Sequence, residues 1–393
     1  MPDARTSEAI ELMTRFAERT GLSPGPHASA PRRYLWTDGF AVCNFLGLQR
    51  ATGQARYREL AHQLVDQVHH ELGRHRRDDR RSGWISGLAE DEAAAHPTFG
   101  GLRIGKPMPE RAARGPLDPE LEWERDGQYF HYLTKWMHAL DRMTRATGQP
   151  TFNVWARELC VAAHRAFTYG PRGDKRMIWK ASIDLSRPLV ASMGHHDPLD
   201  GFVKCAELEA TARELGITGG PRLETQAADF AEMLDRDALA TSDPLGLGGL
   251  LVDACHLAQL ERSSQDLVAA LLAASLTILR HYLAEVDLRA PAQRRLGFRE
   301  LGLAIGLAAI PRLEELARQR LGAAARGQLA ELTRYVSVGT EIEDFWLRPE
   351  HRRTPSWLAH EDINDVMLAT TLAPDGFLVL SPAGLPAEHR SAS

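Results

Sequence analysis

Apolar residues recur at intervals of three and four positions through most of the chain, and alternation of apolar and polar residues is rare. This pattern predicts a nearly all-α protein. Residues 34–57 and 123–152 also share an Asp-Gly near the start of a helix and an Arg-Ala-Thr-Gly at its end. Each stretch therefore resembles one unit of a repeat of helical hairpins.

Two kinds of helix alternate along the chain. The first kind is rich in small and apolar residues on all sides, and its members are expected at 36–48, 125–140, 196–208, 244–260, 296–310 and 361–374. The second kind is amphipathic, and its members are expected at 5–20, 54–73, 151–168, 222–236, 264–285 and 323–336. A helix that is apolar all round must be covered on every side, whereas an amphipathic helix can face water. We therefore expect an inner and an outer layer in a single domain.

That domain should cover residues 1–380, with helix 5–20 pairing with the last inner helix to close a ring, and 381–393 should form a flexible tail. Two insertions interrupt the repeat. Residues 82–124 contain too many Gly and Pro for a long helix, and 174–190 carry the alternation of a short β-hairpin. Both precede an inner helix and should lie on the face where the inner helices begin, with 82–124 as a lid or wall.

The late segment 340–365 shows no helical regularity, so we expect it to be irregular and to help close this face. Its acidic residues Glu341, Glu343 and Asp344 should be solvated. The basic run at 74–81 contains two Asp and is expected to be a solvated loop.

Composition narrows the range of functions. The chain is 44% hydrophobic and 25% charged, as in a soluble globular protein, and its net charge of −5 gives no overall field that would attract nucleic acid. The N-terminus lacks a basic segment followed by an apolar one, and no run of eighteen apolar residues occurs. We expect a cytoplasmic protein with no membrane partner.

The cysteines are Cys43, Cys160, Cys205 and Cys255, and each stands alone in an apolar helical pattern. They should be buried free thiols. The pair Cys255 and His256 is similar to the zinc-binding pair of lanthionine cyclases. However, Cys255 lies well inside its helix and no matching cysteine stands at the start of another inner helix, so no metal and no cofactor are expected.

The six alternating pairs of helices resemble the (α/α)6 toroid of the six-hairpin glycosidase superfamily, which includes unsaturated glucuronyl hydrolases and, with the same architecture, N-acylglucosamine 2-epimerases. The resemblance covers essentially the whole chain and is architectural. It implies an all-α toroid with a pocket at the mouth where the inner helices begin, and a small carbohydrate as ligand. The Arg-Gly-x-Gly-Trp segment of the glucuronyl hydrolases has no match here, and residues 246–251 do not replace it.

The reaction therefore stays open between a glycoside hydrolase, which we prefer, a sugar epimerase or isomerase, and a non-catalytic sugar-binding protein. Glycoside hydrolysis requires two carboxyl groups. The expected catalytic residues stand at the starts of inner helices and are Asp126, Asp38, His196 and Asp200. An Asp at a helix start is also a favoured cap, which is the alternative for Asp38, Asp126 and Asp200 and the preferred interpretation for Asp243 before Pro244.

Aromatic rings bind the apolar faces of sugars, and polar side chains bind the hydroxyl groups. The expected substrate-binding residues are Trp36, Trp84, Trp123, Arg125, Gln128, Tyr129, His131, His195, Asp197, Trp346, Glu361 and Asp362. Core packing is the alternative for each Trp. His196 and Asp197 could act as a base and its partner, which would also suit an epimerase. His131 and Lys135 stand four apart on one helix face, where they are expected to line a cavity.

Overall fold

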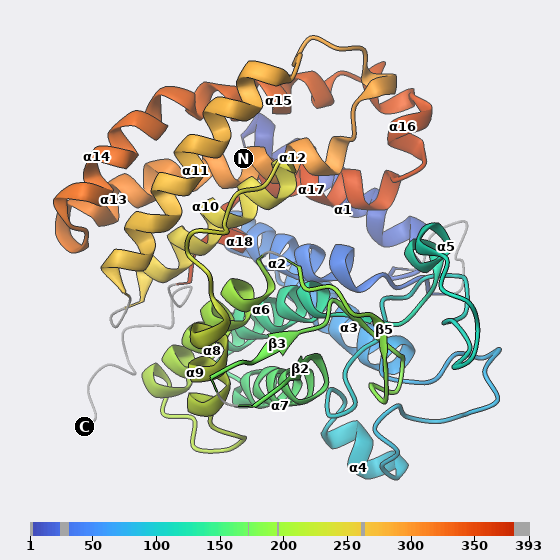
Figure 1. Ribbon diagram of the computed structural model, residues 1–393. Helices are drawn as coiled ribbons and strands as arrows, with labels where there is room; N and C mark the ends of the chain where they lie inside the picture. Colours follow the sequence, from blue (N-terminus) through green and yellow to red (C-terminus); the bar gives the residue numbers. More distant parts are fainter. Residues whose placement is uncertain (1–2, 24–30, 172, 195, 261–263, 381–393) are drawn as a thin grey trace. The chain divides into compact units, whose positions relative to one another are not determined.

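The computed structural model describes residues 3–23, 31–171, 173–194, 196–260 and 264–380 (Figure 1). The chain divides into two compact units, which we describe separately. Within the described residues, unit 1 comprises 3–16, 47–54 and 235–380, and unit 2 comprises 17–46 and 55–234. That a single domain covers 1–380 stays a prediction.

Unit 2 is built mainly of helices that pack in sequence order, with α6 against α7 and α8, and α8 against α9. Its helices are the first part of α2 (Leu35–Thr52), α3 (Ala55–Leu72), α4 (Glu90–Ala95), α5 (Pro119–Glu124), α6 (Phe130–Thr147), α7 (Pro150–Phe167), α8 (Asp197–Glu214) and α9 (Glu224–Met233). Its short strands are β1 (Gln128–Tyr129), β2 (Thr168–Tyr169), β3 (Arg176–Met177), β4 (Lys180–Ala181) and β5 (Pro188–Val190). The strands β1, β4 and β5 form one antiparallel sheet, and β2 pairs with β3.

Unit 1 contains most of α1 (Ala4–Arg19) and the C-terminal helices, with α12 packed against α10, α15 and α17. The C-terminal helices are α10 (Pro244–Gln259), α11 (Gln265–Glu285), α12 (Gly297–Ala308), α13 (Ile310–Arg320), α14 (Ala323–Leu332), α15 (Val336–Leu347), α16 (Pro355–Leu358), α17 (Glu361–Leu372) and α18 (Asp375–Leu378). Three 3-10 turns complete the unit, at Ala292–Arg294, Thr333–Tyr335 and His351–Arg353.

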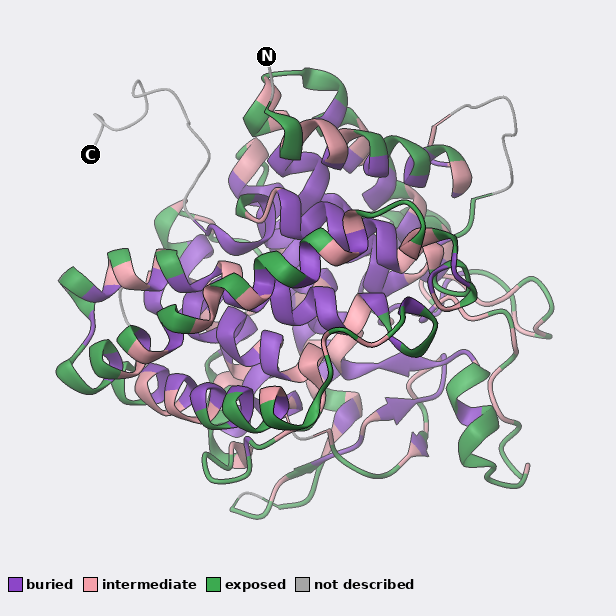
Figure 2. Cartoon of the chain, turned by 90° about the horizontal axis from the view of Figure 1, so that it is seen from above, coloured by how far each residue is buried: buried purple, intermediate pink, exposed green. Residues whose placement is uncertain are grey.

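A helix lies at each of the twelve expected positions, and burial follows the two expected types. Residues 35–48 of α2 are buried on every side, whereas α3 buries one stripe that runs from Tyr57 to Leu72. Figure 2 shows the same contrast, with buried and exposed positions alternating along the outer turns of some helices while others are buried throughout. The β-hairpin expected in 174–190 is also present, as β4 and β5.

The prediction that 340–365 is irregular was wrong, because α15 occupies much of it. The buried residues of α15 are Gly339, Ile342, Glu343 and Trp346, which have the spacing of a helical stripe. Because two of these four positions are a glycine and a glutamate, the sequence shows no apolar periodicity here. The prediction that Glu343 is solvated was wrong for the same reason, since Glu343 is only 4% exposed.

Glu343 connects the beginning of the chain to its end. Arg5 of α1 forms a two-pronged ion pair with this carboxylate and also donates a hydrogen bond of 3.1 Å to the carbonyl of Thr371 in α17. Arg352 makes a second link, of 2.9 Å, to Glu8. The first helix thus contacts the last inner helix, as closing the repeat requires.

Glycines bring α10 and α12 into direct backbone contact within unit 1. A Cβ atom added at Gly248 would lie 2.0 Å from the carbonyl oxygen of Gly302, and one added at Gly306 would lie 2.6 Å from the Cα of Gly248. Neither neighbour is a movable side chain. The close approach of these two helices therefore requires glycine at these positions.

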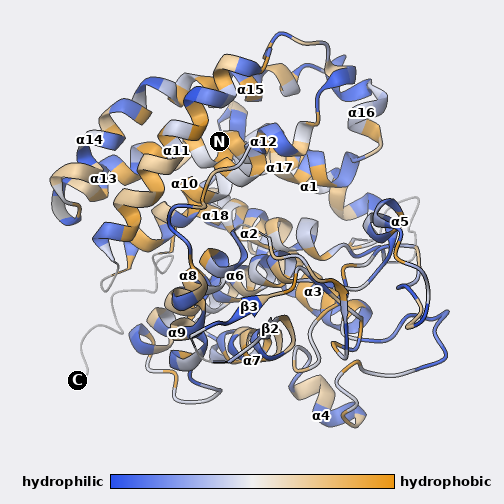
Figure 3. Cartoon of the chain, in the orientation of Figure 1, coloured by the Kyte–Doolittle hydropathy of each residue, from blue (hydrophilic) through white to orange (hydrophobic). Residues whose placement is uncertain are grey.

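The expectations on the cysteines and on Asp243 are met. All four cysteines are free and buried, and the Asp243 side chain caps α10 by accepting a hydrogen bond of 3.1 Å from the Leu245 amide. Within the described residues, α11 is the one helix long and apolar enough to cross a membrane, and Figure 3 colours much of it as hydrophobic. Half of its most apolar window is buried, and the core helices of soluble proteins pass the same test.

Candidate active site

Rings from several segments of unit 2 gather at the starts of α2 and α6. We call them the aromatic cluster, which consists of Tyr34, Trp36, Trp123, Tyr129, His131, Tyr132 and Trp179. The Trp36 ring centroid lies 5.4 Å from that of Tyr132 and 6.0 Å from that of His131. Trp123 is 52% exposed, so the cluster reaches the surface.

The short sheet explains how Trp179 joins the cluster. In the pairing of β1 with β4, Tyr129 lies opposite Lys180, which places the preceding Trp179 against the ring of Tyr129 at 4.8 Å. His131 stacks on both rings, at 5.4 Å from Tyr129 and 6.0 Å from Trp179. The two insertions and the start of α6 therefore build one surface.

The Asp38 carboxylate fixes the start of α2. It accepts a hydrogen bond of 2.9 Å from the Tyr34 amide and pairs with the fully buried guanidinium of Arg33 at 3.3 Å. Asp38 lies inside the first turn of α2, so it binds the amide of the residue before the helix and is not itself the N-cap residue. These contacts fix Tyr34 at the start of the helix.

The Asp126 carboxylate holds the first insertion in place. Its Oδ1 accepts hydrogen bonds from the amides of Gly105, Lys106 and Gly127, at 3.0, 3.3 and 3.1 Å. Its Oδ2 accepts hydrogen bonds from the guanidinium groups of Arg103 and Arg76, at 2.6 and 3.3 Å. A carboxylate has about four lone pairs to offer. These five donors occupy Asp126, which is 0% exposed, and give it a structural role.

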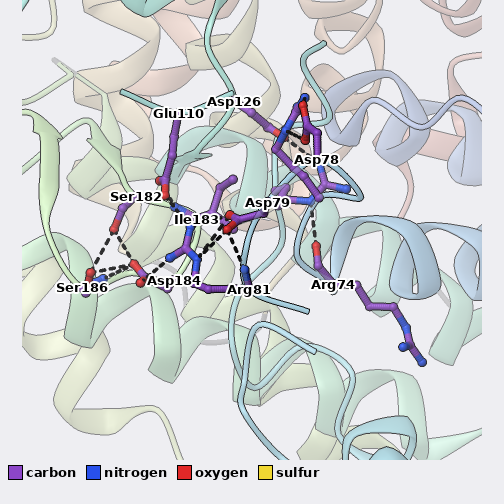
Figure 4. A network of polar contacts seen from close by, with 12 residues as sticks. Arg74, Asp78, Asp79, Arg81, Glu110, Asp126, Ser182, Ile183, Asp184 and Ser186 are labelled. Carbon is purple, nitrogen blue, oxygen red and sulfur yellow. Dashed lines mark hydrogen bonds and ion pairs between the residues drawn. The ribbon is translucent and has the colours of Figure 1, made fainter. Parts of the chain in front are cut away.

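Figure 4 shows that Arg81 joins three parts of the chain into a polar network. Its guanidinium contacts Asp79 in the basic run at 2.7 Å, Glu110 in the first insertion at 2.7 Å, and Asp184 in the second insertion at 2.6 Å. Burial would raise the pKa of Asp184, but hydrogen bonds from Ser186 and Ser182, with the charge of Arg81, lower it to about 2.

The basic run 74–81 is therefore not simply a solvated loop. Arg76 donates hydrogen bonds to two carbonyls of the first insertion, and Arg81 binds both insertions. The same contacts favour a fixed wall over a mobile lid for 82–124. The side chain of Gln128 adds to this wall. It accepts a hydrogen bond of 2.8 Å from the Leu102 amide and donates to the carbonyls of Gly100 and Ile183, at 3.1 and 2.6 Å.

Asp197 and Asp200, one turn apart at the start of α8, form the second part of the candidate site. Asp197 is 4% exposed, and its Oδ2 has no hydrogen-bond partner in the described part of the chain. Burial, reinforced by the charge of Asp200, raises the pKa of Asp197 to about 8. Asp197 is thus a neutral acid at pH 7.

Asp200 is held differently. Both of its oxygens lie 3.3 Å from the Lys135 ammonium, and Oδ2 also accepts a hydrogen bond of 3.3 Å from the Thr134 hydroxyl. Lys135 in turn lies over the Trp36 ring, 5.9 Å from its centroid. Asp200 is therefore connected to the aromatic cluster through Lys135.

The three predicted histidines lie in different surroundings. Burial lowers the pKa of His131 to about 4, so its imidazole is neutral at pH 7 and lies within the cluster, on the same helix as Lys135 as expected. His196 is half-buried at the N-cap of α8, next to Asp197. His195 lies outside the described residues, so its predicted role is not addressed.

Several other predicted residues belong to the core or to unit 1. Trp84 is 7% exposed and lies under the Arg74 guanidinium, 4.5 Å from its ring centroid. Trp346 of unit 1 is 0% exposed and packs on Trp357 at 5.1 Å, which is the core-packing alternative. Glu361 and Asp362 are half-buried in the first turn of α17, also in unit 1.

Arg125 lies between α5 and β1, beside the cluster. Its guanidinium is half-buried and makes no hydrogen bond or ion pair with any residue that the structure describes.

Among the residues that were not expected in the site, Tyr34, Tyr132 and Trp179 complete the aromatic cluster. The sequence could have predicted them, because they are aromatic residues near predicted helix starts or in the predicted hairpin.

Comparison with known proteins defines the fold. No family model matches the chain, and no curated protein matches it. Among solved structures, it is similar to an alpha-mannanase of family GH76 from Bacteroides thetaiotaomicron, with 9% identity, a TM-score of 0.57, and coverage of 95% of this chain and 96% of the mannanase. The chain therefore has an all-α toroid fold, like this mannanase.

Two further structures are more distant. The cellobiose 2-epimerase from Spirochaeta thermophila DSM 6192 has 12% identity, a TM-score of 0.46, and coverage of 94% of this chain and 98% of the epimerase. The unsaturated glucuronyl hydrolase from Bacillus sp. GL1 has 14% identity, a TM-score of 0.37, and coverage of 97% of this chain and 99% of the hydrolase. At these identities the likeness concerns the fold alone.

Proposed function

We propose that this protein is a carbohydrate-active enzyme that hydrolyses a glycosidic bond, with Asp197 as the general acid and Asp200 as the general base. The observation that carries the proposal is the contrast between these two carboxyl groups on one helix face. Glycoside hydrolysis needs one protonated and one ionised carboxyl group, and environments that separate their protonation states identify the acid and the base.

Asp197 has the properties of the acid. Its raised pKa keeps a proton on the carboxyl group at pH 7, and its Oδ2 has no described partner that would hold that proton. Protonation of the leaving oxygen by such a group contributes a rate factor of roughly 10² to 10⁴. Asp200, paired with Lys135, would take the proton of the attacking water.

The aromatic cluster supplies the surface for the sugar. Its rings can lie against the apolar faces of a pyranose, and the exposed Trp123 marks its open side. The similar solved structure is that of an alpha-mannanase, which supports a sugar as ligand. In this proposal Asp38 and Asp126, first expected to be catalytic, shape the site instead.

Steady-state rates on a panel of aryl glycosides and unsaturated uronides test the proposal. Asp197→Asn and Asp200→Asn should each lose roughly 10²-fold or more in kcat. Glycosides with a strongly acidic phenol need little protonation of the leaving group, so they should restore much of the activity of Asp197→Asn and none of that of Asp200→Asn. Asp237→Asn, in an exposed loop, is the control. Wild-type rates in both active-site variants would refute the assignment.

A second candidate function, epimerisation or isomerisation of a sugar, is favoured by His131. A neutral imidazole stacked on Tyr129 and Trp179 can remove a proton from carbon. Incubation with candidate sugars in deuterated water separates the two functions. Incorporation of deuterium at carbon, abolished by His131→Gln and retained in Asp197→Asn, would replace the hydrolase with an epimerase.

A further inference from the structure

Three lysines surround the aromatic cluster, and they differ in how their ammonium groups are satisfied. Lys180 is fully buried and donates hydrogen bonds of 2.5 and 2.8 Å to the carbonyls of Glu122 and Arg125. Lys135 is paired with Asp200. The Lys106 ammonium makes no hydrogen bond or ion pair with the residues that the structure describes.

Lys106 is nevertheless held in place. Its amide donates a hydrogen bond of 3.3 Å to Asp126, and its carbonyl accepts one of 2.6 Å from Arg76. Its ammonium lies 5.6 Å from the ring centroid of Tyr129 and 6.0 Å from that of Trp123. The backbone is fixed by the polar network, and the charged end is directed to the exposed side of the aromatic cluster.

The charges near Lys106 do not neutralise it. Asp126 is fully occupied by its five donors, and Glu124 is an exposed residue that lies outside ion-pair distance of Lys106. Burial lowers the pKa of Lys106 although the charges of Glu124 and Asp126 act to raise it, so these two carboxylates do not offset the removal of the ammonium from water. The hydroxyl of Tyr129, whose ring lies beneath the Lys106 ammonium, also lacks a hydrogen-bond partner.

We infer that the site selects a sugar with a negatively charged substituent, a carboxylate or a phosphate, which binds to the Lys106 ammonium. This inference rests on the proposed sugar-binding function and names the substrate class. An ammonium that is half removed from water and has no acceptor binds an anionic oxygen more strongly than a neutral hydroxyl. Trp123 provides the ring face beside the Lys106 ammonium.

Calorimetric titration of the full chain with glucuronic acid, glucose 6-phosphate and glucose tests the inference without requiring turnover. At least one of the two anionic sugars should bind about tenfold or more tightly than glucose, as one charge-assisted contact allows. The preferred anion distinguishes a carboxylate from a phosphate. The preference should weaken with added salt, because the charged group is partly exposed.

The variants separate this role from a structural one. Lys106→Met should lose the preference for the anion and keep the affinity for glucose within about twofold, whereas Lys106→Arg should retain the preference. Lys175→Met, at an ion pair with Asp229 of α9, is the control, and melting temperatures check that each variant folds. Equal binding of the three sugars by the wild type, no measurable binding of either anion, or a preference that survives in Lys106→Met would overturn the inference.

The binding role of Lys106 and the proposed hydrolysis can each fail without the other. Selective binding of the anion without any turnover would uphold the role of Lys106 and contradict the hydrolase. If the enzyme turned over only neutral glycosides and needed Asp197 and Asp200 to do so, the hydrolase would be upheld and the role of Lys106 contradicted.

Discussion

At the scale of single residues, the protonation of Asp197 links the candidate site to the stability of the fold. The pKa of Asp197 is raised to about 8 in the folded protein, whereas an unfolded Asp titrates near pH ~3.9. Between these values the folded state binds one more proton than the unfolded state. The free energy of unfolding should therefore fall as the pH rises through this window.

Asp197→Asn should remove this dependence. Below pH ~3.9 the variant and the wild type should unfold at similar temperatures, because the carboxyl group of the wild type is then neutral in both the folded and the unfolded state. From there to about pH 8 the variant should become progressively the more stable, because the unfolded wild type ionises while its folded carboxyl group stays neutral. Thermal melts from pH 3 to pH 9 measure the difference. Curves that run parallel would contradict the raised pKa.

The five donors around Asp126 give a different prediction. Asp126→Asn leaves the guanidinium groups of Arg76 and Arg103 without their carboxylate, and breaking a buried pair in this way costs about 3–5 kcal/mol. Urea denaturation measures the loss. Asp78→Asn removes an exposed partner of the same Arg76 and should change stability far less. If the two variants are equally stable, the structural role of Asp126 is wrong.

The sequence located candidate residues but could not assign a role to each of them. Asp38, Asp126 and Asp200 stand alike at helix starts, and each had capping as an alternative. What separates them is the partner that each one meets, and Arg76 lies 50 positions from Asp126 in the sequence. Lys106 lies in a loop without any periodic signal. No local pattern reports such contacts.

At the scale of elements, the helices were largely predictable, because apolar spacing and Gly at a helix end are local signals. Gly148 illustrates this, since it ends α6 in the left-handed conformation at φ 71°. The exceptions arose where packing overrode the local signal. In α15, Gly339 and Glu343 occupy buried positions that an apolar pattern would fill with larger side chains.

The polar network around Arg81 should control how firmly the insertions are held. Arg81→Met removes contacts to Asp79, Glu110 and Asp184 at once. Because local opening governs cleavage of folded proteins, we expect thermolysin to cut residues 82–124 at least several-fold faster, with helical content unchanged. Arg77→Met, at a side chain that is 84% exposed, is the control. Equal cleavage rates would show that other contacts hold the insertion.

At the scale of the whole molecule, the fold class was predictable and the reaction was not. Alternation of two helix types implies two layers, which is a property of the fold, whereas chemistry depends on a few side chains from distant segments. The order of the chain adds a kinetic consequence. Unit 1 combines residues 3–16 with 235–380, so it cannot be completed until Glu343 and Thr371 have been synthesised and can bind Arg5.

The contact between Gly248 and Gly306 restricts how this sequence can change over evolutionary time. Gly248→Ala or Gly306→Ala alone must push α10 and α12 apart, which should cost roughly 1–3 kcal/mol. The same displacement makes room for the second methyl group, so the double variant should lose less stability than the sum of the two, as a double-mutant cycle by urea denaturation would measure. Once one glycine is lost in a lineage, selection to keep the other weakens. Among descendants of this sequence, the two glycines should therefore tend to persist together or disappear together.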